Sequence, residues 1–530
     1  MKLRKVLALG LALAMASSFA AYAEDPKANQ ALDVNQDAPN TEVTDETLRI
    51  ALASEPSTLW QGAAGKTENE ASIIGGALMD TLLVQDQITG ELLPNLATEW
   101  EWVDDTHCRF TLRDDVTMSD GTPLIAEDVA YTIKLYAELS ANTDYGRFFD
   151  AETTAAEDEH TVTIGFNTKA PDLLAMLSWT ARGIVSEDEV NALGGPEKAA
   201  SAPALGCGKY IFKEWVSGQS VTLERNDNYW NPDWKGYFKE IVFTFVNDGA
   251  TRAMSVESGD VDVTYELPIN QAATTLVNPN LNTYLYTFGQ VSHLFFNMGD
   301  ENRPTSDLKV RQAIDLAMNY DAVAAVGTAG FGTQALGYFD STSQYYTPTY
   351  TVEERAQDID RAKELLAEAG YENGLNLETI ALQNEVSVYT VIQECLAQAG
   401  ITLTINTVDT AQYVQDAFGG NYDIIMVGEY TAARIPSLFV FFQKGPIDSG
   451  FVIGGDKYTT EELDAAITEA IEEADPEKVM EELAAIEQTF KDETLEVNLY
   501  PQMQSIITAT DIKGATTRER SYVDVTNFYK

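Results

Sequence analysis

The stretch covering residues 375–428 limits the fold more than any other part of the sequence. A strand pattern at 377–382 is followed by a helix pattern whose apolar face runs through 388–399, and by alternating apolar residues at 401–405. The run Ile424-Ile-Met-Val427 is continuously apolar, as in a strand buried on both faces of a parallel sheet. This order of elements predicts a βαβ unit and therefore an α/β fold.

The end of this stretch is also a candidate binding site. Ligands of open α/β sheets bind beyond the carboxyl ends of the parallel strands. That rule points to the three residues that follow the apolar run, Gly428, Glu429 and Tyr430.

Further elements are predicted by apolar periodicity. Strands are expected at 48–52, 221–224 and 241–246, and helices at 310–318, 359–369 and 463–471. Gly370 and Gly400 are placed where a left-handed residue ends a helix. A Thr459-x-x-Glu462 capping box is expected to open the helix at 463–471, and Asp475-Pro476 to begin the next one.

The first 23 residues have the pattern of a secretory signal peptide. Lys2, Arg4 and Lys5 precede an apolar run at 6–16, and Ala21-Tyr-Ala23 forms a small-residue cleavage site. The apolar run is shorter than the roughly 20 residues that cross a bilayer. No cysteine lies near Ala23 to carry a lipid anchor, so we expect a secreted protein free in the periplasm, with a polar leader at 24–45 before the fold.

Length and charge restrict the class of protein. A chain of 530 residues favours two or three domains. The net charge of −49 excludes a nucleic-acid partner, since phosphate binding needs the opposite sign. Attraction of a cationic ligand and a merely well-solvated surface both fit this charge, and the surface explanation is favoured. Cys108, Cys207 and Cys395 contain no C-x-x-C pair, which favours buried free thiols over a disulfide.

The sequence contains no sharp enzymatic signature. G-x-S-x-G, H-E-x-x-H, Walker and G-x-G-x-x-G motifs are missing. His107, His160 and His293 are scattered without zinc-ligand spacing. Paired carboxylates for glycoside hydrolysis carry little weight among 83 acidic residues. We therefore expect no enzyme, no cofactor and no metal site.

Several ordered blocks resemble a known family. They are Leu96-Ala-Thr-Glu-Trp100 with Phe110-Thr-Leu-Arg113 and the segment 120–129, then Gly208-Lys-Tyr-Ile-Phe-Lys-Glu-Trp215 with Tyr229-Trp230, Gly259-Asp-Val-Asp262, Phe296-Asn297 before 310–314, and finally 362–370. Together they resemble the family 5 extracellular solute-binding proteins, the dipeptide and oligopeptide binders of ABC importers, over nearly all of residues 46–530.

The resemblance implies a type II periplasmic-binding-protein fold, with two lobes joined by a hinge and an additional inserted domain. It implies lobe I at 46–82, 200–289 and 497–530, the inserted domain at 83–199 and lobe II at 290–496, with the hinge near Gly289 and Val497. Closure of the lobes around a solute would then create the state that docks on a membrane permease.

The resemblance also guides the choice of ligand contacts. Dipeptide and oligopeptide binders hold the peptide amino group with an Asp shortly after the buried strand, where this chain has Ala432. Glu429 and Arg434 are therefore expected to anchor charged ends of the ligand, and Trp60 and Tyr430 to wall the site, since ligand sites are lined by aromatic residues. The remaining candidate contacts are Glu55, Phe296, Asn297, Phe331 and Gly428.

We therefore expect a monomeric, non-catalytic binding component of an ABC importer. Its solute is expected to be a peptide or a molecule of similar size, delivered to a permease in the inner membrane. An oligosaccharide or a nickel chelate as ligand stays open because of Ala432. A secreted glycosidase-like hydrolase, and a periplasmic chaperone or chemoreceptor ligand-presenter, are the rival classes.

Overall fold

The computed structural model describes most of the chain beyond the N-terminal segment. The described residues are 43–60, 69–86, 90–139, 146, 148–168, 171–199, 206–430, 460–473, 475–518 and 522–530. The predicted signal peptide, and the predicted leader up to residue 42, lie outside this part of the chain.

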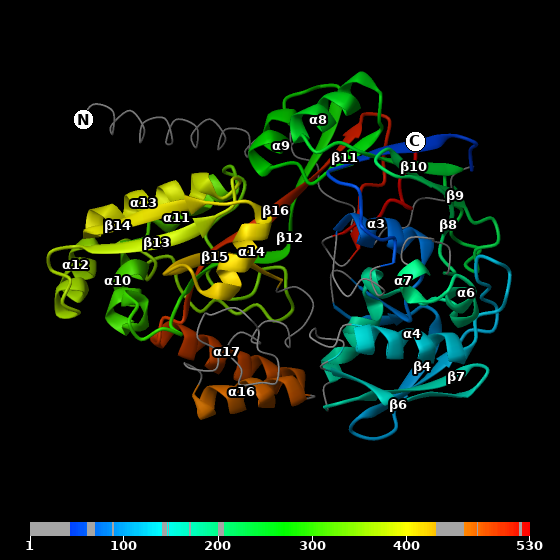
Figure 1. The fold of residues 1–530 in the computed structure, drawn as a ribbon, viewed down its shortest axis with the longest axis horizontal. Helices are drawn as coiled ribbons and strands as arrows, with labels where there is room; N and C mark the ends of the chain where they lie inside the picture. The colour runs from blue at the N-terminus through cyan, green and yellow to red at the C-terminus, as the bar shows by residue number, and fades with distance from the viewer. Residues whose placement is uncertain are drawn as a thin grey trace. The chain divides into compact units, whose positions relative to one another are not determined.

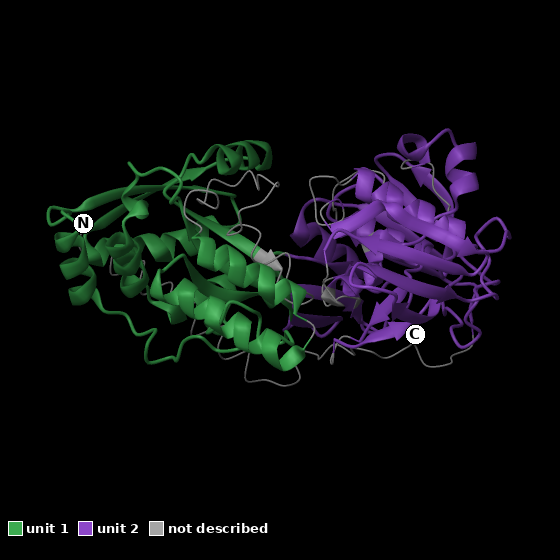
Figure 2. Ribbon diagram, turned by 90° about the horizontal axis from the view of Figure 1, so that it is seen from below, with its two compact units in different colours: residues 1–28, 268–273, 287–503 green, residues 29–267, 274–286, 504–530 purple. Residues whose placement is uncertain are grey.

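The chain forms two units, which are described here one at a time (Figure 2). Unit 1 contains residues 1–28, 268–273 and 287–503, and unit 2 contains residues 29–267, 274–286 and 504–530. Two long strands labelled in Figure 1, β12 (Leu281–Phe296) and β16 (Glu496–Ala509), each begin in one unit and end in the other. The finer division into two lobes and an inserted domain stays a prediction.

The main sheet of unit 2 is built around the first strand. Its order is β16-β11-β1-β10-β9-β8. The bounds are β1 (Thr47–Leu52), β8 (Tyr210–Val216), β9 (Ser220–Arg225), β10 (Glu240–Phe245) and β11 (Val263–Tyr265). β1 runs parallel to both β10 and β11, whereas β9 and β16 are antiparallel to their neighbours. These bounds confirm the predicted strands at 48–52, 221–224 and 241–246.

A second, antiparallel sheet in unit 2 has the order β4-β5-β7-β6. Its strands are β4 (Ala97–Trp102), β5 (His107–Leu112), β6 (Phe149–Asp158) and β7 (Thr161–Phe166). Helix α4 (Ala126–Leu139) packs on β6 and β7. A turn precedes α4, where the carboxylate of Asp120 accepts the Thr122 N–H at 2.8 Å and Gly121 has φ 89°.

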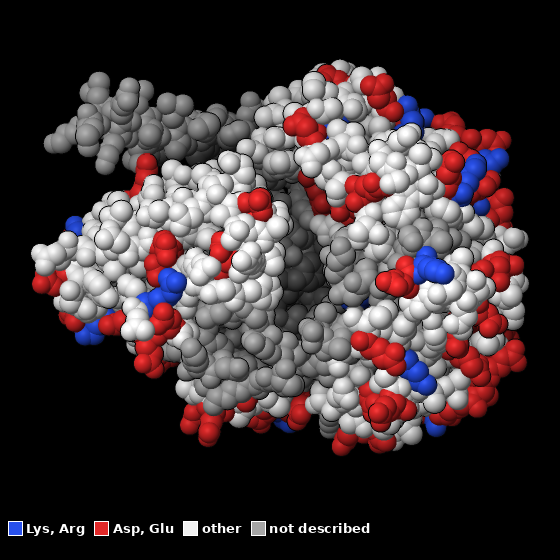
Figure 3. All heavy atoms as spheres, in the orientation of Figure 1, with Lys and Arg blue, Asp and Glu red and all other residues white. Residues whose placement is uncertain are grey.

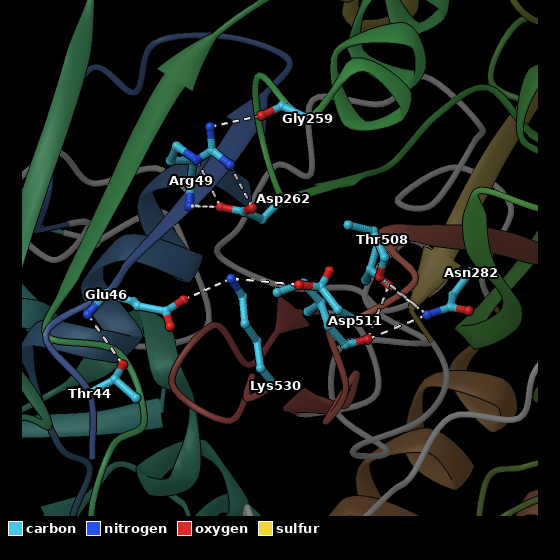
Figure 4. A network of polar contacts seen from close by, with 11 residues as sticks. Thr44, Glu46, Arg49, Gly259, Asp262, Asn282, Thr508, Asp511 and Lys530 are labelled. Atoms are coloured by element: carbon cyan, nitrogen blue, oxygen red, sulfur yellow. Dashed lines mark hydrogen bonds and ion pairs between the residues drawn. The ribbon is translucent and has the colours of Figure 1, made fainter. Parts of the chain in front are cut away.

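A polar network ties the C-terminus of the chain to the first strand of unit 2 (Figure 4). Lys530 Nζ lies 2.7 Å from Glu46 Oε2 and 3.6 Å from Asp511 Oδ2. Arg49 on β1 pairs with Asp262 at 2.8 Å, just before β11. The residues next to β1 and the C-terminal residues of unit 2 are thereby joined.

The predicted βαβ unit is confirmed in unit 1. β13 (Leu375–Ala381) and β14 (Ile401–Thr407) are parallel neighbours connected by α13 (Val386–Ala399), which packs on β14. Gly400 ends α13 with φ 92°, a left-handed conformation that glycine adopts without strain.

The predicted direction of the next strand is wrong. β15 (Ile424–Tyr430) pairs antiparallel with β12, with Ile424 opposite Phe296 and Gly428 opposite Ser292. Ile424 and Ile425 are completely buried. A continuous apolar run reports burial on both faces, and burial does not depend on strand direction.

The helices predicted in unit 1 are confirmed, with one change at a cap. α10 (Leu308–Ala317), α12 (Ile359–Glu368) and α16 (Glu461–Glu472) match the predicted ranges, and Asp475 caps α17 (Pro476–Asp492). The capping box at Thr459 is wrong by one position. The hydroxyl of Thr460 accepts the Leu463 N–H at 3.1 Å and is the N-cap, while Thr459 lies outside the described residues.

The remaining elements are short. They are α3 (Asn69–Leu78), α6 (Glu187–Ala192), α7 (Pro196–Ala199), α8 (Gly249–Ser258), α9 (Ile269–Thr275), α11 (Tyr320–Gly327), α14 (Thr410–Gly419), β2 (Leu83–Gln85), β3 (Leu92–Pro94), β17 (Thr517–Arg518), β18 (Tyr522–Val523), and the 3-10 helices η1 (Pro171–Ser178), η2 (Thr180–Arg182) and η3 (Pro304–Ser306). Among the described residues, no helix combines the length and apolarity needed to cross a membrane.

Candidate ligand-binding site

The predicted site at the end of β15 lies in unit 1. Gly428 is exposed, and a Cβ at this position would come within 2.4 Å of Nε2 of Gln502. Gln502 in turn donates to Ser292 Oγ at 2.9 Å. The backbones of Glu429 and Tyr430 continue β15, but their side chains, like Ala432 and Arg434 altogether, lie outside the described residues. Because β15 is antiparallel to its neighbour, the carboxyl-end rule no longer supports this location.

The other predicted contacts in unit 1 are buried or half-buried. Phe296 is completely buried at the end of β12. Asn297 is 1% exposed and donates through Nδ2 to the carbonyl oxygens of Gly420 and Tyr422, at 3.0 and 3.1 Å. Phe331 is half-buried in the turn after α11. Asn297 therefore holds the loop before β15, and its predicted contact with a ligand stays a prediction.

Glu55 and Trp60 lie in unit 2, after β1. Glu55 accepts hydrogen bonds from Trp215 Nε1 at 2.8 Å and from the Gly218 N–H at 2.9 Å. The Gly218 N–H, followed by the Trp215 indole, lowers the pKa of the Glu55 carboxyl. Trp60 is 3% exposed and donates to Tyr136 Oη at 2.8 Å. Both side chains thus have partners within unit 2.

A cluster that the sequence analysis missed lies at the carboxyl ends of β1 and β11, which are adjacent and parallel. We call it the acidic cluster, and it consists of Ser54, Asn69, Glu70, Glu266 and Gln504. Ser54 follows β1, Glu266 follows β11, and Asn69 and Glu70 open helix α3. This is the location where open α/β sheets bind ligands.

The hydrogen bonds of the acidic cluster leave both carboxylates partly free. Glu266 Oε1 accepts from Asn69 Nδ2 at 2.9 Å and from Gln504 Nε2 at 3.3 Å. Glu70 Oε1 accepts from Ser54 Oγ at 2.7 Å. In the described part of the chain, no Lys or Arg side chain forms an ion pair with either acid. Burial, and next the nearby Glu70 carboxylate, raise the pKa of Glu266 to about 7.

The backbone of Glu266 is held in a strained conformation. Its φ of 52° lies in the left-handed region, which is rare for residues other than glycine. The Glu266 N–H donates to the Ser505 carbonyl at 2.9 Å, and its own carbonyl accepts from the buried Arg252 at 3.1 Å. Strain that neighbouring contacts enforce in this way is concentrated at functional sites.

The acidic cluster can be recognised only when the order of the strands in the sheet is known. Its members come from segments more than 400 residues apart and form no sequence motif. The rule about carboxyl ends would have identified Ser54 and Glu266 once β1 and β11 were known to be parallel neighbours.

His293 and the three cysteines are buried inside their units. His293 is completely buried in unit 1, where its Nδ1 lies 2.8 Å from Glu496 Oε2. Cys108, Cys207 and Cys395 are buried and unpaired. Nowhere in the described ranges do three or more His, Cys, Asp or Glu side chains come together as ligands for a metal ion.

Comparison with known proteins gives a consistent result. The sequence model of the "Bacterial extracellular solute-binding proteins, family 5 Middle" matches residues 91–445. The periplasmic murein peptide-binding protein MppA of Escherichia coli (strain K12) is 24% identical over 388 residues, which cover 68% of this chain and 71% of MppA. The glutathione-binding protein GsiB of the same strain is 26% identical over 336 residues, or 62% of this chain and 63% of GsiB.

A solved structure shows the same fold over most of this chain. The dipeptide-binding protein of Pseudoalteromonas sp. SM9913, in complex with Met-Leu, is similar with a TM-score of 0.78 and 21% sequence identity. The likeness covers 92% of this chain and 100% of that one.

Proposed function

The chain belongs to the bacterial extracellular solute-binding proteins of family 5, and on this premise we propose that it captures a peptide, or a solute of similar size, for an ABC importer. Its fold is the type II periplasmic-binding-protein fold, and its role is solute binding. Peptide is favoured as the ligand because murein peptide, glutathione and Met-Leu are the ligands named for the relatives.

The acidic cluster is the observation that supports this proposal. It places a strained glutamate, a second glutamate and a glutamine beyond two parallel strands of unit 2. These are groups that orient a polar ligand through hydrogen bonds and charge. Gly428, Glu429, Tyr430 and Arg434 of unit 1 stay predicted contacts.

The mode of action follows from the family. We propose that binding is not followed by a chemical step, and that the two predicted lobes close on the solute about the predicted hinge near Gly289 and Val497. The closed form would deliver the solute to a permease in the inner membrane. A periplasmic location, reached by means of the signal peptide at 1–23, and a monomeric state belong to the same proposal.

Thermal unfolding with candidate ligands tests the proposal. The chain without residues 1–23 is screened with dipeptides, tripeptides, glutathione, maltooligosaccharides and nickel–histidine. A ligand at 100 times its Kd is expected to stabilise the protein by about 2.7 kcal/mol. Mass spectrometry before and after incubation is expected to show the ligand unchanged.

Two results would contradict the proposal. If only oligosaccharides or only nickel–histidine stabilise the protein, the ligand is that solute and not a peptide. Conversion of a ligand, abolished by removing one acidic side chain, would make the protein an enzyme of the hydrolase class.

A further inference from the structure

We propose that Glu70 and Glu266 form a subsite for a cationic nitrogen of the ligand, a primary ammonium or a guanidinium group. This inference rests on the proposed function, and it narrows the ligand to peptides that carry a positive charge at the bound end or side chain.

The general acidity of the protein does not carry this inference. Asp and Glu side chains lie in many separate places on the visible face in Figure 3, and Lys and Arg are fewer. Most exposed acids of such a surface are simply solvated. Glu70 and Glu266 differ because both are half-buried and both lack a cationic partner among the described residues.

Arg252 is the cation whose charge acts on the pair, and its guanidinium donates its hydrogen bonds to other groups. Arg252 is 2% exposed, and its guanidinium donates to the carbonyl oxygens of Val246, Asn247 and Glu266, at 2.8, 2.9 and 3.1 Å. Its Nε donates to Thr264 Oγ1 at 3.2 Å. Arg252 therefore fixes the strained backbone. Its charge acts on Glu266 and Glu70 without forming an ion pair with either carboxylate in the described part of the chain.

A buried hydroxyl next to the pair provides independent support. Tyr265 is 3% exposed, and its Oη has no hydrogen-bond partner among the described residues. Burial, and then the charges of Glu266 and Glu70, raise the pKa of this phenol well above its usual range. A buried phenol oxygen without a partner costs free energy, so an N–H of the ligand that donates a hydrogen bond to this oxygen would stabilise the bound state.

Binding of a cation here is coupled to a proton. The groups that face Glu266 are Glu70 on α3, Tyr265 on β11, Arg252 on α8 and the Asn69 and Gln504 amides. With its pKa raised to about 7, Glu266 holds a proton in part of the molecules at neutral pH. A cationic ligand favours the ionised form, so binding should release this proton and strengthen as the pH rises through 7.

The test uses titration calorimetry with defined probes at pH 8. The probes are the tripeptides Ala-Ala-Ala, Lys-Ala-Ala, Ala-Lys-Ala and Ala-Ala-Lys, each with a free and with an acetylated amino end. The variants are Glu70→Gln and Glu266→Gln, which keep an oxygen to accept the bonds from Ser54 and Asn69. Glu257→Gln is the matched control, since Glu257 is an exposed acid of the same unit.

We expect each of the two cluster variants to bind a charged probe about tenfold more weakly than the wild type, because one charge-assisted hydrogen bond is lost. The control variant should bind like the wild type. Acetylation of the recognised nitrogen should weaken the affinity of the wild type by a similar factor and should change the affinity of Glu266→Gln little. Heats measured at pH 7 in phosphate and in Tris should reveal proton release by the wild type that Glu266→Gln lacks.

The two proposals fail in different ways. Equal affinity for charged and blocked probes, or equal losses in Glu266→Gln and Glu257→Gln, would overturn the cationic subsite and leave peptide binding intact. A wild-type protein that binds none of the probes would overturn both. Unchanged thermal unfolding of the cluster variants checks that they are folded.

Discussion

The carboxylate of Asp262 holds the Arg49 guanidinium through two hydrogen bonds, one to Nε at 3.0 Å and one to Nη2 at 2.8 Å, and also accepts the backbone N–H of Arg49 at 2.8 Å. Asp262 is buried, so these bonds join β1 to the start of β11 where little water can replace them. Asp262→Asn should therefore lower the free energy of unfolding by about 1–3 kcal/mol. Urea unfolding followed by tryptophan fluorescence measures this change.

An exposed pair provides the control for this prediction. Arg113 and Asp115 form a similar two-bond pair at 2.8 Å, but Asp115 is 54% exposed. Asp115→Asn should cost less than about 1 kcal/mol because solvent screens the pair. Equal losses in the two variants would show that burial of Asp262 is not what makes its pair stabilising.

Gly208 should tolerate no side chain. A Cβ there would lie 2.3 Å from the Leu78 carbonyl carbon and 2.5 Å from the Met79 nitrogen, both backbone atoms. We expect Gly208→Ala to lower the free energy of unfolding by about 3 kcal/mol or more, or to prevent folding, because backbone atoms cannot move aside as a side chain can. Gly218→Ala is the control. Its Cβ meets no atom within 4 Å, so only the left-handed φ of 72° should cost about 1 kcal/mol.

Glu487 should make unit 1 less stable at alkaline pH. It is 2% exposed, and burial raises its pKa from 4.5 to about 7 despite the bonds from the Thr349 hydroxyl and the Tyr338 N–H. Between these two values the native state keeps a proton that the unfolded state has lost, so the stability contributed by Glu487 is full below pH 4.5 and is lost as the pH rises through 7.

The variant Glu487→Gln removes this titration. Relative to the wild type, its free energy of unfolding should rise between pH 4.5 and 8 by up to roughly 3 kcal/mol. Glu481→Gln, an exposed position on the same helix α17, should show no such change. Urea titrations at several pH values measure the difference, and parallel curves for Glu487→Gln and the wild type would refute the prediction.

Arg355 should not be replaceable by lysine. Its guanidinium carbon lies 3.9 Å from the ring centre of Tyr320 and 4.1 Å from that of Tyr350, and Nη2 donates to the Asn498 carbonyl at 2.9 Å. Lysine lacks the planar group that stacks on two rings, so Arg355→Lys should cost about 2–4 kcal/mol. The control Arg361→Lys, at a 44% exposed position, should cost less than about 0.5 kcal/mol in the same thermal unfolding assay.

Local sequence patterns predicted the elements of this fold well. The alternation at Leu48, Ile50 and Leu52 gave β1, and Gly400 marked the end of α13, because each signal depends only on residues within one element. The direction of β15 could not be obtained in this way. Pairing is decided by which strand lies beside it, and β12 is more than 100 residues earlier in the chain.

The candidate site was less accessible to sequence reasoning for the same reason. Ser54, Glu70 and Glu266 meet because β1 and β11 are neighbours, a tertiary fact that no spacing encodes. Asn297 and Trp60 show that residue type alone also does not identify a ligand contact. Their residue types suit a ligand site, yet the structure gives the Asn297 amide and the Trp60 indole hydrogen bonds within their own units.

The bond between Lys530 and Glu46 has a consequence for the order in which the protein matures. β11 receives its partner β16 only from residues 506–508, and the bridge between Lys513 and Tyr529 closes later still. Unit 2 therefore cannot complete its pairing until residues 506–529 have been synthesised, however early β1 is made. A truncation that removes these residues should leave β11 without the partner strand that covers one of its edges.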